Sequence, residues 1–208
     1  MTSIDWLENQ SDVSSIIAAT FARVNSSKKE LRSHLSSLYL PYVYWQEEIS
    51  TQEDYSNKLK SLENALYLWV LFSYSQWLSL ISEVSNKNEW NINLSEVVRI
   101  WQGGCIIRAS LLEDLVWELH NGISNLLESK LVRSEVETNL KDLVWIINST
   151  NNYRLPTPVL SSSLQYFYSM TQEQSNANMI QILRDHFWAH TYERIDREGI
   201  FHTEWDFK

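Results

Sequence analysis

The scarcity of residues that interrupt helices constrains this fold more than any other feature of the sequence. Only 4 of the 208 residues are glycine and only 3 are proline. Because glycine and proline end helices and form tight turns, a chain with so few of them favours long helices joined by few turns. A chain of this length can also bury a hydrophobic core without disulfides or structural metals. We therefore expect a single all-α domain over residues 1–208.

Apolar side chains recur at helical spacing along most of the chain. Recurrence three and four residues apart places them on one face of a helix. The most apolar run, 65–81, is interrupted by Ser73, Ser75 and Gln76, so we interpret it as a buried helix and not as a membrane span. We expect helices over 11–35, 57–86, 106–129, 133–150, 159–170 and 176–194, and a short tail over 199–208. A further helix should begin at a cap at Asn93 or Ser95 and end at a break at Gly103–Gly104. The helix over 106–129 should be broken at Asn121–Gly122.

Charge and cysteine content restrict the partners of the chain. The net charge is -9 and the isoelectric point is near 5.0, which argues against binding to nucleic acid or to anionic membranes. Cys105 is the only cysteine, so the chain can form neither an internal disulfide nor a cysteine-based zinc site. No basic segment followed by an apolar core marks a signal peptide at the N-terminus. We expect a cytoplasmic protein with no nucleic-acid or membrane partner.

Aromatic residues are unusually frequent. The chain contains 10 tryptophans and 10 tyrosines. Large amphipathic rings are typical of aromatic-lined pockets and of oligomer interfaces, and they also supply volume to a core. For most of the tryptophans we expect the core role.

Four stretches carry a more specific signal. They are SIIAATFARVNSSKKELR (15–32), IWQGGCIIRASLL (100–112), LPTPVLSSSLQYFYS (155–169) and NMIQILRDHFWAHTYERIDREGIFHTEW (178–205). In this order and spacing they resemble the C-terminal helical domain of the 6-phosphogluconate dehydrogenase family. The resemblance extends from about residue 12 to 205. It implies an all-α helical bundle that forms an intertwined homodimer.

Two parts of the full-length family enzyme have no counterpart in this sequence. Such enzymes begin with a Rossmann domain, and a long helix then supplies a lysine and a glutamate as general base and acid for oxidative decarboxylation. The sequence contains no GxGxxG motif and no such helix. We therefore expect a free-standing C-terminal half-enzyme that binds no cofactor and has no dehydrogenase activity alone. NADP would bind only if a partner protein supplied the Rossmann domain.

Three residues match positions that bind substrate in the family. Arg23, in FAR, matches an arginine that holds the substrate phosphate, and Arg184 and His190 match two residues that the second subunit donates to the phosphate and its sugar. Guanidinium groups match phosphate oxygens and an imidazole adds a donor. The alternative is that the arginines pair with Asp185, with Glu193 or with an interface.

Four positions depart from the family pattern. Trp188 and Trp77 replace glycines, Trp69 replaces a small residue, and His186 replaces a tyrosine. Because a filled core does not accept added bulk cheaply, the three indoles must face space that the full-length enzyme fills with something else. We therefore predict an intersubunit cavity lined by tryptophan. The alternative is that the tryptophans only cover a surface that loss of the other domain exposed.

The preferred interpretation is a repurposed domain. The cavity would bind or convert a small apolar or aromatic molecule, in specialised metabolism, with His190, His186 and Glu193 as candidate acids or bases that need no cofactor. The substrate-binding candidates are Arg23, Arg184, His190, Trp188, Trp69 and Trp77.

Three alternatives remain open. In the first, the chain is the C-terminal subunit of a split NADP-dependent 6-phosphogluconate dehydrogenase. In the second, it is a noncatalytic scaffold or regulator that pairs with the genuine enzyme. A metal site at His186 and His190 rests on their spacing alone, without the HExxH arrangement, so no metal is predicted.

Overall fold

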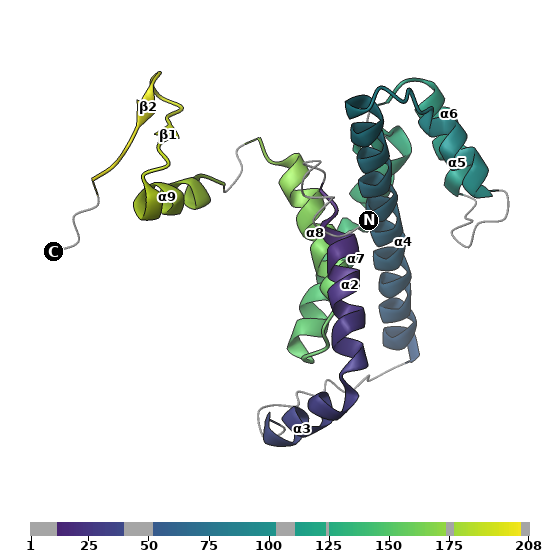
Figure 1. Ribbon diagram of the computed structural model, residues 1–208. Coiled ribbons are helices and arrows are strands. Elements are labelled where there is room, and N and C mark those ends of the chain that lie inside the picture. The colour runs from purple at the N-terminus through teal and green to yellow at the C-terminus, as the bar shows by residue number, and fades with distance from the viewer. Residues whose placement is uncertain (1–11, 40–51, 103–110, 124, 174–176, 205–208) are drawn as a thin grey trace. The chain divides into compact units, whose positions relative to one another are not determined.

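The structure is a computed structural model that describes residues 12–39, 52–102, 111–123, 125–173 and 177–204. Strands in these ranges are limited to one short hairpin, so the predicted all-α class is confirmed (Figure 1). No helix in the described ranges is both long and apolar enough to cross a membrane. The elements are α2 (Ser14–Ser27), α3 (Lys29–Tyr39), α4 (Gln52–Lys87), α5 (Leu94–Gln102), α6 (Leu111–His120), the 3-10 helix η1 (Leu126–Glu128), α7 (Lys130–Asn152), α8 (Pro158–Thr171), α9 (Ala177–Trp188), β1 (Tyr192–Glu193) and β2 (Ile200–Phe201).

The chain divides into two compact units, residues 1–167 and 168–208. The first contains α2 to α7 and most of α8. The second contains the end of α8, helix α9 and the hairpin of β1 and β2. The single domain expected over residues 1–208 stays a prediction.

Helix α4 forms the centre of the first unit. It packs most extensively against α7, which runs beside it (Figure 1). Leu68, Leu71 and Phe72 of α4 are completely buried, and so is Leu143 of α7. Burial of a large apolar side chain contributes about 1.5–3 kcal/mol each. The interpretation of the run 65–81 as a buried helix is confirmed.

Polar and aromatic contacts join α2 and α8 to α4. The Gln76 side chain accepts a hydrogen bond from the Ser15 amide at 3.2 Å and donates one to Ser14 Oγ at 3.1 Å. The rings of Phe72 and Phe167 stack with centroids 5.1 Å apart. Helices α2, α4 and α8 therefore share one core.

A buried hydrogen-bond network crosses the same region. Ser75 Oγ donates to Asn125 Oδ1 at 3.0 Å and lies 2.8 Å from the Tyr166 hydroxyl oxygen. Asn125 Nδ2 donates to Ser79 Oγ at 3.1 Å, and Asn125 Oδ1 also caps η1 by accepting from the Leu127 amide. Burial raises the pKa of Tyr166 above its usual value. One side-chain network thus connects α4, η1 and α8.

Side chains cap the helices where the structure begins them. Asn93 Oδ1 accepts from the Ser95 amide at 3.0 Å, which confirms Asn93 as the cap of α5. Ser129 Oγ accepts from the Val132 amide at the start of α7. The Glu118 carboxylate of α6 also accepts from the two α7 amides of Lys130 and Leu131, at 2.9 and 3.1 Å. A carboxylate stabilises these amides because they have no partner within the helix.

Two predictions about where helices of the first unit end can be compared with the observed helices. The helix expected over 11–35 is two helices, because the chain bends at Lys28, where φ is -85° and ψ is 53°. The break at Asn121–Gly122 is confirmed, and Gly122 adopts a left-handed φ of 89° there. The break expected at Gly103–Gly104 lies outside the described residues.

The last predicted helix is too long. Helix α9 ends at Trp188, whereas we expected a helix through residue 194. Ala189 and Thr191 have φ values of 50° and 62°, which a right-handed helix does not contain. Tyr192 then pairs with Phe201 in an antiparallel hairpin, so the expected tail contains a strand.

Tryptophan does not supply the core as expected. No tryptophan in the described part of the chain is fully buried, and leucine dominates the buried set instead. The indole is too large and carries a polar N–H group, so complete burial is uncommon. The exposed tryptophans are Trp77, Trp90, Trp117, Trp145 and Trp188.

Candidate functional site

Arg184 lies on α9 with its side chain exposed. It forms no ion pair or hydrogen bond with the described residues. Asp185, the partner that the alternative interpretation offered, directs its carboxylate elsewhere: Oδ1 accepts from the Thr191 amide at 2.9 Å and Oδ2 from the Thr203 amide at 3.0 Å. The alternative pairing of Arg184 with Asp185 is therefore wrong.

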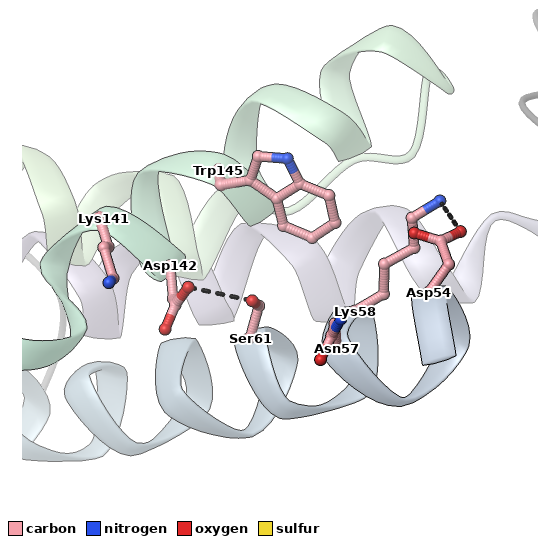
Figure 2. A pocket seen from close by; sticks show the side chains of 7 residues that line it. All are labelled: Asp54, Asn57, Lys58, Ser61, Lys141, Asp142 and Trp145. Atoms are coloured by element: carbon pink, nitrogen blue, oxygen red, sulfur yellow. Dashed lines mark hydrogen bonds and ion pairs between the residues drawn. The ribbon is translucent and has the colours of Figure 1, made fainter. Parts of the chain in front are cut away.

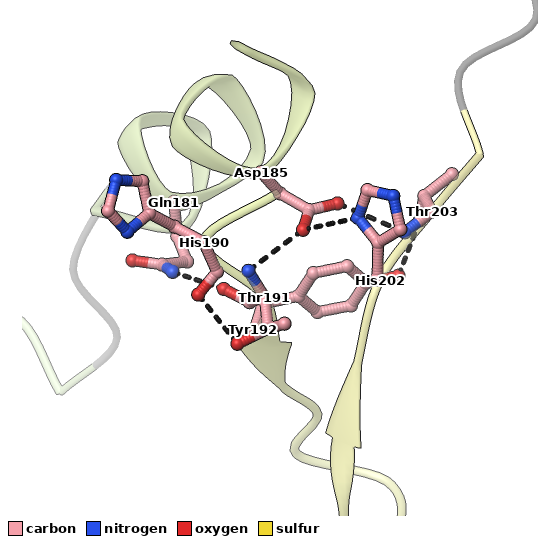
Figure 3. A network of polar contacts seen from close by, with 7 residues as sticks. All are labelled: Gln181, Asp185, His190, Thr191, Tyr192, His202 and Thr203. Atoms are coloured by element: carbon pink, nitrogen blue, oxygen red, sulfur yellow. Dashed lines mark hydrogen bonds and ion pairs between the residues drawn. The ribbon is translucent and has the colours of Figure 1, made fainter. Parts of the chain in front are cut away.

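His190 lies in the turn between α9 and β1 and is exposed. Its ring meets the indole of Trp188 edge-on, with centroids 6.1 Å apart. The Thr191 hydroxyl donates to the His190 carbonyl oxygen at 2.6 Å. Figure 3 shows His190 beside the polar contacts that surround this turn. The structure thus brings together His190 and Trp188, two of the predicted substrate-binding residues.

The structure does not support the spacing argument for a metal site at His186 and His190. Because α9 ends at Trp188, the two imidazoles do not occupy successive turns of one helix. Within the described ranges, no group of three histidine, cysteine, aspartate or glutamate side chains is arranged to hold a metal ion. The described residues therefore give no support for a metal site at these two histidines.

The three candidate acids and bases lie on different elements of the second unit. His186 is half-buried on α9, where its ring lies 4.9 Å from that of Phe187. His190 occupies the turn, and Glu193 is exposed on β1 opposite Ile200. Their catalytic role stays a prediction.

The remaining candidates belong to the first unit. Arg23 is exposed on α2 and makes no ion pair with the described residues. On α4, Trp77 is 40% exposed and Trp69 is half-buried with an indole N–H group that meets no acceptor in the described ranges. Because Trp188 belongs to the other unit, a cavity shared by the three tryptophans stays a prediction.

A groove of about 420 Å³ lies between α4 and α7, as Figure 2 shows. Lys58 pairs with Asp54 at 3.0 Å within α4, and Asp142 of α7 accepts from the α4 side chains of Ser61 at 3.0 Å and Asn64 at 2.7 Å. None of the predicted site residues lines it. The hydrogen bonds of Asp142 join the two helices, so we assign Asp142, Ser61 and Asn64 a structural role.

Sequence reasoning missed the residues that hold the His190 turn. Asp185 is completely buried, and its oxygens accept from Thr191, from Thr203 and from the ring of His202, whose Nδ1 lies 2.9 Å away. The partners lie up to 18 residues away, so helical periodicity does not reveal them. Gly199, which ends the turn with a φ of 122°, was a turn signal in the sequence.

Comparison with known proteins shows the family. A family model described as 6-phosphogluconate dehydrogenase, C-terminal domain, matches residues 1–205. A decarboxylating 6-phosphogluconate dehydrogenase of Staphylococcus epidermidis is 38% identical over 98% of this chain and 43% of its own length. The corresponding enzyme of Buchnera aphidicola subsp. Baizongia pistaciae is 40% identical over 76% of this chain and 33% of its own length.

A solved structure gives the same result. The structure of Plasmodium falciparum 6-phosphogluconate dehydrogenase, determined in its apo form and in complex with NADP+ and with 6-phosphogluconate, superposes with a TM-score of 0.85. It is 34% identical and covers 97% of this chain and 43% of its own. The chain thus spans less than half the length of these full-length relatives. It belongs to the 6-phosphogluconate dehydrogenase family and corresponds to the C-terminal domain of that family.

Proposed function

We propose that this chain is the substrate-phosphate-binding C-terminal part of a decarboxylating 6-phosphogluconate dehydrogenase. The carrying observation is the match to enzymes of that name over nearly the whole chain, at 38% identity. Together with a coenzyme-binding part, the chain would oxidise and decarboxylate 6-phosphogluconate with NADP as the oxidant. This is the second of the interpretations that the sequence left open.

The exposed arginine and histidine support this role. Arg184 has no carboxylate partner among the described residues, so its guanidinium is available to phosphate oxygens. His190 adds an imidazole donor in the adjacent turn, and Arg23 of the first unit offers a second guanidinium that makes no ion pair with the described residues. Since the chain carries a net charge of -9, local cations are needed to hold a dianionic phosphate.

The second unit supports the proposed homodimer. Ile180, Leu183, Phe187 and Trp188 of α9 are each more than half exposed. Apolar side chains gathered on one short helix are typical of a surface that another protein covers. In the proposed dimer this helix docks on the second copy, where Arg184 and His190 complete the site that contains the partner subunit's Arg23.

The repurposed cavity has less support than the dehydrogenase role. The relatives named above are 6-phosphogluconate dehydrogenases. The catalytic candidates His186 and Glu193 have no observation in their favour beyond their residue types.

Reconstitution tests the proposal. The chain is mixed with the N-terminal part of the Staphylococcus epidermidis relative, which it does not match, and NADPH formation from 6-phosphogluconate is followed by absorbance. We expect turnover from the mixture and none from either part alone. Co-purification without turnover would contradict the enzyme role and would support the scaffold or regulator. Failure of the parts to associate, with no substrate binding by the chain, would contradict the proposal altogether.

A further inference from the structure

The turn that carries His190 has an unusual backbone conformation. Ala189 has a φ of 50° and Thr191 a φ of 62°, so left-handed residues flank His190 on both sides. This conformation is disfavoured for residues other than glycine, and most strongly for a β-branched residue such as threonine. Because the local chain does not favour this turn, surrounding contacts must hold it.

Asp185 makes the central contacts. Its side chain is completely buried. Oδ1 accepts from the Thr191 amide at 2.9 Å and Oδ2 accepts from the Thr203 amide at 3.0 Å, as Figure 3 shows. A buried carboxylate is tolerated only where donors replace its lost hydration. Here the donors come from the segments just before and just after the hairpin, so one side chain joins α9 to both.

Further hydrogen bonds act on the same segments. His202 Nδ1 lies 2.9 Å from the carboxylate Oδ1. The Gln181 side-chain amide donates to the Thr191 carbonyl oxygen. The Tyr192 and Thr203 hydroxyl oxygens lie 2.7 Å apart. The residue after His190 is therefore held at both its N–H and its carbonyl group.

The buried carboxylate does not neutralise the adjacent arginine. Consecutive residues of a helix do not face each other, so Asp185 and Arg184 point in different directions. Asp185 is inside the unit, whereas Arg184 and His190 are exposed. The negative charge is thus engaged by internal donors while the cationic side chain stays open to an anion.

We propose that Asp185 is a positioning residue for the phosphate site. By holding the backbone on the far side of His190, it fixes where the imidazole stands relative to Arg184, without touching the ligand itself. Donors fixed in place before binding give higher affinity, because less freedom is lost when the ligand arrives. The identity of the ligand, the phosphate of 6-phosphogluconate, rests on the proposed function.

The first measurement needs no activity. Amide hydrogen exchange is followed in the full chain for the wild type, for Asp185→Asn and for Asp196→Asn. Asp196 receives the same change in the same unit, but it is exposed, and its ion-pair partner among the described residues is Arg194 at 2.7 Å. We expect exchange at Thr191 and Thr203 to accelerate by about tenfold or more in Asp185→Asn and to change little in Asp196→Asn.

The second measurement separates positioning from a merely structural role. In the reconstituted enzyme, Asp185→Asn should raise KM for 6-phosphogluconate by about tenfold, while KM for NADP and kcat at saturation change less than about threefold. If Asp185→Asn does not fold, His202 provides a milder probe, because it is exposed and touches the same oxygen. His202→Ala should raise KM for 6-phosphogluconate, and His202→Asn, which keeps a donor near the Nδ1 position, should restore it.

The outcomes distinguish the two proposals. Wild-type turnover with unchanged KM in Asp185→Asn and in His202→Ala would overturn the positioning role and leave the dehydrogenase role intact. Unchanged exchange at Thr191 would overturn it as well. Absence of wild-type turnover, with accelerated exchange in Asp185→Asn, would show that Asp185 holds the turn. It would also show that the proposed function, and with it the phosphate ligand, is wrong.

Discussion

At the scale of single residues, the chemistry of the site was visible in the sequence and its geometry was not. Arg184 and His190 were identified from a motif that surrounds them. The turn that carries His190 involves the left-handed φ of Thr191 and a hydrogen bond to the buried Asp185, which helical periodicity does not report. A carboxylate that follows an arginine in sequence suggests an ion pair, yet here the helix separates the two.

Trp188 gives the sharpest residue-level prediction. Its indole is 72% exposed and stands 6.1 Å from the His190 ring, at a position where the family has glycine. Bulk next to the imidazole narrows the space for a sugar phosphate. We expect Trp188→Gly to lower KM for 6-phosphogluconate by about fivefold, the equivalent of about 1 kcal/mol of relieved crowding.

Trp117→Ala is the matched control for Trp188→Gly. Trp117 is 71% exposed on α6 and is not among the residues matched to the substrate site, so its loss should leave KM unchanged. A higher KM in Trp188→Gly would mean that the indole contacts the substrate instead of restricting it. Kinetics of both variants in the reconstituted enzyme decide between these roles.

At the scale of secondary-structure elements, periodicity predicted the long helices well, but it predicted neither the bend and end of the shorter helices nor the hairpin. α4, α7 and α8 have long regular apolar patterns and few interruptions, and their predicted ranges lie within the observed ones. The bend at Lys28 and the end of α9 at Trp188 are marked by neither glycine nor proline. The strands of the hairpin span two residues each, too short for an alternating pattern to be recognised.

The network around Tyr166 predicts how α8 is held. Tyr166 is buried and its hydroxyl lies 2.8 Å from Ser75 Oγ. Tyr166→Phe should lower the free energy of unfolding by about 1 kcal/mol, measured by urea denaturation. Tyr67→Phe is the control, because the Tyr67 hydroxyl makes no hydrogen bond with the described residues. Equal losses in the two variants would contradict a specific role for the network.

The pH dependence of stability follows from the same residue. Burial raises the pKa of Tyr166 above its unfolded value of 10.0, so the folded state keeps the proton where the unfolded state releases it. The stability that this group contributes is complete below pH 10 and is lost as the pH rises through the folded pKa. Tyr166→Phe should therefore lose less stability than the wild type as the pH rises above 10. A parallel decline in both proteins would contradict this assignment.

At the scale of the whole molecule, the chain is a mostly helical protein that matches less than half of its full-length relatives. The family and the fold class could be predicted from sequence, because the matching stretches are long and ordered. The preferred function could not, since it rested on three tryptophans whose surroundings no sequence pattern describes. The names of the relatives shift the weight to the dehydrogenase role.

Substrate selectivity tests the central claim most directly. The claim is that this chain holds the phosphate of 6-phosphogluconate through Arg184. In the reconstituted enzyme, kcat/KM is measured for 6-phosphogluconate and for gluconate, which lacks the phosphate, with Arg184→Ala compared to Arg133→Ala, an exposed arginine on α7.

Loss of one charge-assisted contact to phosphate costs about 1.5–3 kcal/mol. We therefore expect Arg184→Ala to reduce the preference for 6-phosphogluconate over gluconate by about tenfold or more, and Arg133→Ala to leave it unchanged. A preference that is the same in wild type and in Arg184→Ala would contradict the account.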